Sequence, residues 1–93
     1  MNYFKRNWEE SRGDEFDNWG SSEWWLELDE EGYTIRNLQV YENGNELIYT
    51  ETNPEDKYGI LPEGQMDLSE FEEFRIEKTE FDRRFSKANA INV

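Results

Sequence analysis

Carboxylates are the only abundant acid and base groups in this chain, because its 93 residues include 23 Asp and Glu but no histidine and no cysteine. The usual general base and the thiolate nucleophile are therefore both missing. Glu23, Glu27 and the acids of residues 9–22 could supply the carboxylate pair of a glycosidase, but their spacing sets no pair apart. The sequence predicts a protein that is not an enzyme.

Oxygen ligands for a cation gather in two short stretches, Asp14 to Asn18 and Asp29 to Glu31. Calcium accepts such oxygens. Neither stretch has the spaced D-x-[DN]-x-[DN]-G pattern of an EF-hand loop, so incidental cation binding is the expectation. We predict no metal site and no cofactor.

The chain is strongly acidic, with a net charge of −13. Residues 9–31 hold ten acids against one base, Arg12, whereas residues 69–93 are close to neutral. A field of this sign repels nucleic acid and anionic membranes, and it attracts cationic proteins. We therefore expect a basic protein partner, with no direct nucleic-acid or membrane binding; the composition leaves the oligomeric state open.

Aromatic rings are interleaved with the acids of this segment. Exposed rings supply desolvated contact area, and carboxylates around them raise association rate and specificity. Whether Phe16, Trp19 and Trp25 are exposed or belong to the core stays open at this point. The predicted partner-binding residues are Asp14, Glu15, Phe16, Asp17, Trp19, Glu23, Trp25, Glu27, Asp29, Glu30 and Glu31.

This pattern predicts an acidic inhibitor or immunity protein that binds and blocks a basic, nucleic-acid-acting protein. The same acids could stand in for phosphates, which gives a first alternative: a phage-encoded, anti-CRISPR-like anti-defence protein that mimics DNA. A second alternative is a carbohydrate-binding module, because Trp25 shares a strand face with Glu27 and Asp29 and an exposed ring there would stack on a sugar.

The elements that must position these residues are mainly strands, since alternating apolar residues and turn residues dominate the first half. Asp29-Glu30-Glu31-Gly32 and Asn43-Gly44 are hairpin signals. A bulge near Arg36 or Asn37 would bring Ile35 into phase with its strand. The expected strands are Tyr3 to Trp8, Glu23 to Asp29, Tyr33 to Glu42 and Leu47 to Thr52.

In the second of these strands, Trp24, Leu26 and Leu28 point one way and are expected in the core. Trp25, Glu27 and Asp29 point the other way, and this alternation predicts a solvated face.

The C-terminal third predicts a helix that begins near Thr79 and carries Phe81 and Phe85 at helical spacing. Before it, Ser69 to Ile76 fits either a helical turn with a capping box or a short strand, and we expect a turn followed by a strand. Asn89 to Val93 is expected to fray. The fold class is α+β: one domain, residues 1–93, with a mainly antiparallel meander sheet of four to five strands and a short C-terminal helix packed on one face.

Four segments carry a resemblance to known proteins: Tyr3 to Glu10, Asp14 to Gly20, Val40 to Gly44, and Phe74 to Phe81. Together they resemble a family of small uncharacterised bacterial domains. In size and acidity the chain is also similar to toxin-immunity proteins, which bind and block a partner toxin; this similarity implies no particular functional residue.

The chain starts with Met1-Asn2-Tyr3-Phe4-Lys5-Arg6, which lacks the apolar run of a signal peptide. No window reaches the length of a membrane span, and the chain needs no disulfides. A cytoplasmic location is therefore expected.

Overall fold

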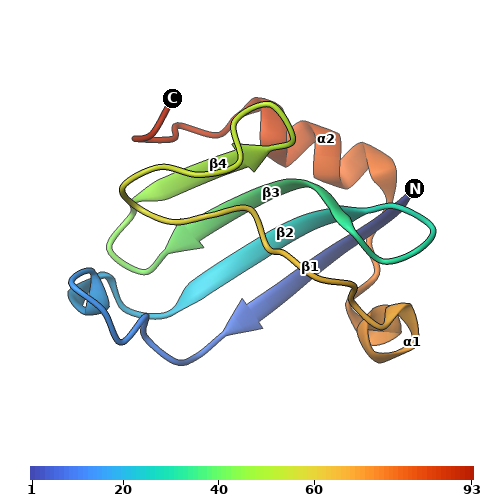
Figure 1. Ribbon diagram of the computed structural model, residues 1–93, viewed down its shortest axis with the longest axis horizontal. Helices are drawn as coiled ribbons and strands as arrows, with labels where there is room; N and C mark the ends of the chain where they lie inside the picture. Colours follow the sequence, from blue (N-terminus) through green and yellow to red (C-terminus); the bar gives the residue numbers. More distant parts are fainter.

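The computed structural model describes residues 1–93. Its four strands form one antiparallel sheet in the order β1-β2-β3-β4 (Figure 1). This order confirms the predicted meander, with four strands rather than five. The strands are β1 (Asn2–Trp8), β2 (Ser22–Leu28), β3 (Thr34–Tyr41) and β4 (Glu46–Thr50).

The turns and the bulge lie close to their predicted positions. Gly32 and Gly44 both have positive φ, +97° and +94°, in the turns that precede and follow β3. In the β2–β3 register Glu27 pairs with Arg36 but Leu28 pairs with Thr34, so Ile35 is the extra residue. The bulge therefore lies one residue before the predicted Arg36 or Asn37.

The sheet face that was predicted to be solvated is buried. On it Tyr3, Trp25 and Leu38 form a cluster with Phe81, which comes from α2 (Lys78–Ser86). Trp25 is only 5% exposed. The prediction of a solvated face was wrong. Alternation within one strand shows which side chains share a face, but it does not show which distant segment of the chain covers that face.

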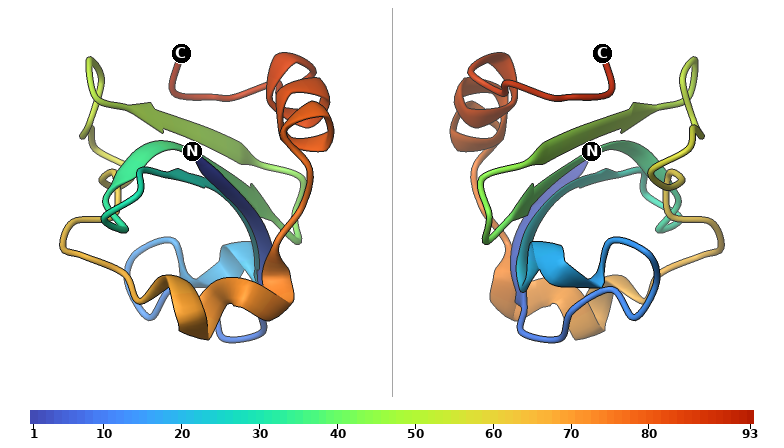
Figure 2. Two further views of the ribbon diagram at one scale, coloured as in Figure 1. Left: turned by 90° about the vertical axis from the view of Figure 1, so that its right-hand side faces the viewer. Right: turned by 90° about the vertical axis from the view of Figure 1, so that its left-hand side faces the viewer.

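The opposite face is covered by three segments from elsewhere in the chain. Phe4, Leu26 and Leu28 pack beneath α1 (Leu68–Phe71) and the 3-10 helix η2 (Glu72–Phe74). Residues 54–67 cross the same face, and Figure 2 shows them and α2 on different sides of the curved sheet.

A second cluster on this face contains Trp19, Tyr41, Leu47 and Tyr49, beneath residues 58–61. Trp24, predicted to be core, is half-buried and lines a cavity instead. The alternation placed it correctly with Leu26 and Leu28, but the covering segments do not fill the space above its ring.

The helical segments begin earlier than the capping-box patterns predict. Asp67 caps α1 by accepting a hydrogen bond from the Ser69 amide at 2.9 Å, and α2 starts at Lys78 without a side-chain cap, so Thr79 lies inside the helix. The predicted fifth strand is a single bridge between Phe4 and Arg75.

The C-terminal residues are held against β4, so the prediction that they fray was wrong. The Ile91 amide donates to the Glu46 carbonyl at 2.9 Å, and the Asn89 amide donates to the Glu46 side chain at 3.1 Å. None of the helices has the length and apolar character needed to cross a membrane.

Candidate binding surfaces

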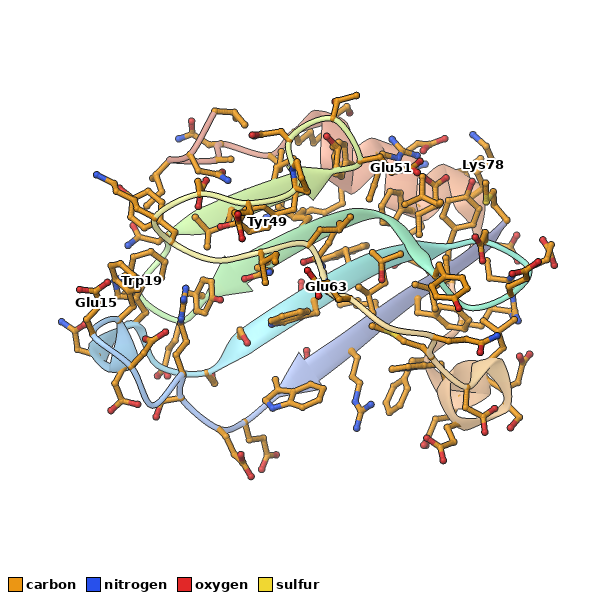
Figure 3. All side chains as sticks on the ribbon, in the orientation of Figure 1. Glu15, Trp19, Tyr49, Glu51, Glu63 and Lys78 are labelled. Carbon is orange, nitrogen blue, oxygen red and sulfur yellow. The ribbon has the colours of Figure 1, made fainter.

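The acidic loop, residues 9–21, connects β1 to β2 at one end of the sheet. It contains a 3-10 helix, η1 (Asp17–Trp19), and Figure 3 shows Glu15 beside Trp19 at that end of the molecule. Its exposed acids are Glu9, Glu10, Asp14, Glu15 and Asp17. The loop therefore presents five carboxylates to solvent within 13 residues.

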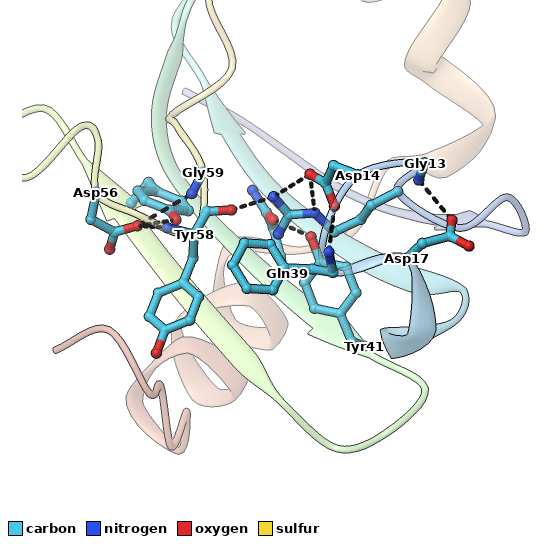
Figure 4. Close-up of polar contacts among 11 residues, drawn as sticks. Gly13, Asp14, Asp17, Gln39, Tyr41, Asp56, Tyr58 and Gly59 are labelled. Carbon is cyan, nitrogen blue, oxygen red and sulfur yellow. Dashed lines mark hydrogen bonds and ion pairs between the residues drawn. The ribbon is translucent and has the colours of Figure 1, made fainter.

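Two of these carboxylates fold the loop onto itself (Figure 4). Asp17 accepts hydrogen bonds from the Gly13 amide, at 2.8 Å, and from the Ser11 hydroxyl. These bonds hold the pKa of Asp17 below its ordinary value. Asp14 accepts from the Phe16 amide at 2.8 Å. Asp14 and Asp17 thus shape the loop in addition to contributing charge.

Arg12 joins the acidic loop to the rest of the protein. Its Nε donates to Asp14 at 3.1 Å, and its Nη2 donates to the Tyr58 carbonyl on the segment that crosses the sheet. Its guanidinium also lies over three rings: Phe16 at 4.9 Å, Trp19 at 5.6 Å and Tyr41 at 5.7 Å. The sequence pattern predicts no role for Arg12, although Arg12 stands out as the only base in residues 9–31.

The rings of the acidic loop pack inward. Trp19 is 8% exposed, and its ring centroid lies 4.9 Å from Phe16, 5.0 Å from Tyr41 and 5.7 Å from Tyr58. Phe16 is half-buried. Both rings therefore support the loop from below, and the surface that a partner would meet consists mainly of carboxylates.

Glu23, Trp25 and Glu27 lie on the face that α2 covers. Glu23 lines a small cavity together with Glu9 of the acidic loop, whereas Trp25 and Glu27 lie farther along β2. The Trp25 indole donates to Glu23 at 2.8 Å. Trp25 is too buried to stack on a sugar, so the observation that motivated a carbohydrate-binding module is absent.

Glu27 is a buried ion-pair partner. Arg36 donates to its two oxygens at 2.7 and 3.2 Å and also to Asp82 at 3.1 Å. Burial by itself raises the pKa of Glu27, but hydrogen bonds from Arg36 and from the Tyr3 hydroxyl outweigh it and lower the pKa below the ordinary value. Glu27 is therefore a charged structural group and not a surface acid.

Asp29, Glu30 and Glu31 lie at the other end of β2, which separates them from the acidic loop by roughly 20 Å at about 3.3 Å per strand residue. Asp29 accepts from the amides of Glu31 and Tyr33 and so closes the β2–β3 turn. Glu30 pairs with the Met1 amino group at 2.8 Å. The predicted partner-binding residues consequently occupy three separate places.

A cavity of about 530 Å³ opens next to the acidic loop, on the face opposite α2. No local sequence pattern predicts this cavity, because its walls come from five separate segments of the chain. Its lining includes Arg6, Trp8, Trp24, Gln39 and Tyr41.

Nowhere do three or more Asp and Glu side chains come close enough to hold a metal ion. Comparison of the chain with family models, curated proteins and solved structures found no match, so the fold and the surfaces described above are what a functional assignment rests on.

Proposed function

We propose that this protein is a non-enzymatic inhibitor that binds a basic protein partner through the acidic loop. The observation that carries the proposal is the combination of exposed carboxylates with an internally hydrogen-bonded loop backbone. The net charge of the whole protein, −13, adds a long-range electrostatic field of the same negative sign.

The acidic loop is ordered before any partner arrives. Asp14 and Asp17 accept amide hydrogen bonds from within the loop, Arg12 ties it to Tyr58, and Trp19 anchors it in the aromatic cluster. A loop that is already ordered loses little conformational entropy on binding, and this preserves affinity.

Three carboxylates of the loop are free to pair with a partner. Glu9, Glu10 and Glu15 are exposed, and none of them makes an ion pair or a hydrogen bond within the chain. Exposed acids of this kind chiefly raise the association rate with a cationic surface and select against acidic partners. A nucleic-acid-processing enzyme presents such a cationic surface.

The proposal is tested with Glu9→Lys/Glu15→Lys, which reverses two free charges and removes no contact within the protein. Wild type and variant serve as bait in host lysate, and retained basic proteins are quantified and assayed for inhibition. We expect the partner to bind the variant at least about tenfold more weakly, with a smaller difference at high salt.

A matched control is Glu51→Lys/Glu63→Lys, which makes the same change in net charge at exposed positions away from the acidic loop (Figure 3). It should retain most of the affinity. Equal losses in the two variants would mean that only net charge matters, and would contradict the acidic loop as the binding surface.

Competition with the partner's own nucleic acid distinguishes a DNA mimic from an inhibitor that binds elsewhere. A DNA mimic occupies the nucleic-acid cleft, so added nucleic acid should displace it. An inhibitor at another site should remain bound while nucleic acid is present.

A further inference from the structure

The cavity next to the acidic loop has the size and composition of a small-molecule site. Its volume of about 530 Å³ lies within the usual range for such sites, and half of its 14 lining residues are hydrophobic. It adjoins the proposed partner surface, because Glu10 of the acidic loop belongs to its lining, but its floor is the sheet and not the exposed side of the loop.

The floor of the cavity is a row of side chains across three strands. Arg6 of β1 lies opposite Trp24 of β2, and Trp24 lies opposite Gln39 of β3. The next row places Trp8 and Tyr41 on either side of Ser22. The Trp24 ring therefore lies between a guanidinium on one strand and an amide on another.

Hydrogen bonds within the protein hold this floor in place. The Tyr41 hydroxyl donates to Gln39 at 2.6 Å, and Gln39 donates to Asn37 at 2.8 Å. The Trp24 indole donates to the Ser22 hydroxyl at 2.8 Å. Since Gln39 and Tyr41 are 3% and 4% exposed, the polar chain is buried and the floor is pre-formed.

Arg6 is an unpaired cation in a chain with 23 acids. It makes no ion pair and no hydrogen bond within the protein. Its guanidinium lies instead over the rings of Trp8 at 4.6 Å, Phe74 at 5.0 Å and Phe71 at 5.2 Å. Stacking uses the faces of the guanidinium and leaves its in-plane N–H donors available for an anion.

The lining of the cavity is positive although the protein is strongly negative. Arg6 and Arg12 outnumber the single acid, Glu10. Arg12 already pairs with Asp14 at 3.0 Å, but its Nη1 atom is buried without a hydrogen-bond partner. Two smaller cavities of about 400 Å³ each are lined by acids and contain no Lys or Arg. Charge complementarity thus favours an anion in the larger cavity.

We propose that this cavity binds a small planar anion: an aromatic or heteroaromatic ring that stacks on Trp24, with one carboxylate or phosphate that accepts hydrogen bonds from Arg6. The ring covers the aromatic floor, and the anionic group neutralises the unpaired guanidinium. Bidentate pairing of a guanidinium with carboxylate or phosphate supplies the orientation.

Adenosine monophosphate and indole-3-acetate represent the two sources of such an anion, and adenosine and indole are their uncharged counterparts. Each is titrated into the ¹⁵N-labelled protein while the indole N–H signals are followed. We expect at least one of the two anions to shift the Trp24 signal, and to leave Trp25, on the other face of the sheet, in place. No shift by either anion at millimolar concentration, or equal shifts of Trp24 and Trp25, would overturn the proposal.

Arg6→Gln should weaken binding of the active anion by about tenfold or more, because charge-assisted hydrogen bonds are lost, and should change binding of its uncharged counterpart less. Arg6→Lys keeps the charge and should give a smaller loss; the spectra report folding of both variants. The control is Arg83→Gln, which removes an exposed arginine on α2 and should leave affinity unchanged. Equal affinities in wild type and Arg6→Gln would refute the role of Arg6.

Discussion

The side chain of Asn92 pairs with the backbone of Ile48 as a neighbouring strand would. Its amide nitrogen donates to the Ile48 carbonyl at 2.8 Å, and its oxygen accepts from the Ile48 amide at 2.9 Å. The same amide nitrogen donates to Asp56 at 2.8 Å. One residue near the C-terminus therefore occupies the open edge of β4, where unpaired backbone groups would otherwise invite another chain.

Asn92→Leu should destabilise the protein by roughly 2–3 kcal/mol, because the two backbone groups of Ile48 and one oxygen of Asp56 lose their partner. It should also promote concentration-dependent self-association through β4. Urea denaturation and size-exclusion chromatography measure the two effects. Asn89→Leu is the control, since the Asn89 side chain makes no hydrogen bond; if both variants behaved alike, Asn92 would not protect the edge.

Gly32→Ala should cost more stability than Gly44→Ala, although both glycines have positive φ. A Cβ at Gly44 meets no atom within 4 Å, so only backbone strain of about 1 kcal/mol is expected there. A Cβ at Gly32 would lie 2.1 Å from the Met66 carbonyl oxygen and would displace the segment that Gly32 binds through the Met66 amide. We expect Gly32→Ala to lower the free energy of unfolding by roughly 3 kcal/mol in chemical denaturation, and similar costs at the two positions would contradict the close contact.

Arg36→Met should destabilise the protein by about 2–3 kcal/mol, because Glu27 would stay buried without its ionic partner. The estimate lies below that for a fully buried pair since the Arg36 side chain is 29% exposed. Adding Glu27→Gln to Arg36→Met should restore part of the loss by removing the unpaired charge. If the double variant were less stable than Arg36→Met, the unpaired Glu27 carboxylate would not be the cause of the lost stability.

Asp56 should make the protein less stable in acid. Burial raises its pKa, but hydrogen bonds from Tyr49, Asn92 and the amides of Tyr58 and Gly59 outweigh this and lower it. A pKa that is lower in the folded state adds stability at neutral pH, and that stability is lost as pH falls from about 4 through the folded-state pKa.

The Asp56 prediction is checked by comparing wild type with Asp56→Asn across pH. The difference in free energy of unfolding should be largest at neutral pH and should shrink as pH falls below about 4, because the carboxyl of the unfolded chain takes up a proton there before that of the folded protein does. Glu55→Gln, at an exposed neighbour without side-chain hydrogen bonds, should show no such trend. A difference that stays constant down to pH 2 would exclude Asp56 as a source of acid sensitivity.

The sequence by itself determined the strands and the two tight turns on either side of β3, because these depend on local patterns. Alternation defines a strand within seven or eight residues, and Asn43-Gly44 closes a hairpin whose partners are adjacent in the chain. The excess of acid in residues 9–31 was also visible, since charge is a property of composition.

Only the tertiary structure decided which side chains the strands and loops hide. Trp24 and Trp25 are adjacent in sequence but differ in burial. Trp25 packs against Phe81 of α2, whereas Trp24 lines a cavity that is bordered by Gly59, Ile60 and Met66. Trp19 became a support for the acidic loop because Tyr41 and Tyr58, far away in sequence, supply its contacts. Burial depends on which distant segments pack together, and the sequence of a single strand or loop does not specify which segments will cover it.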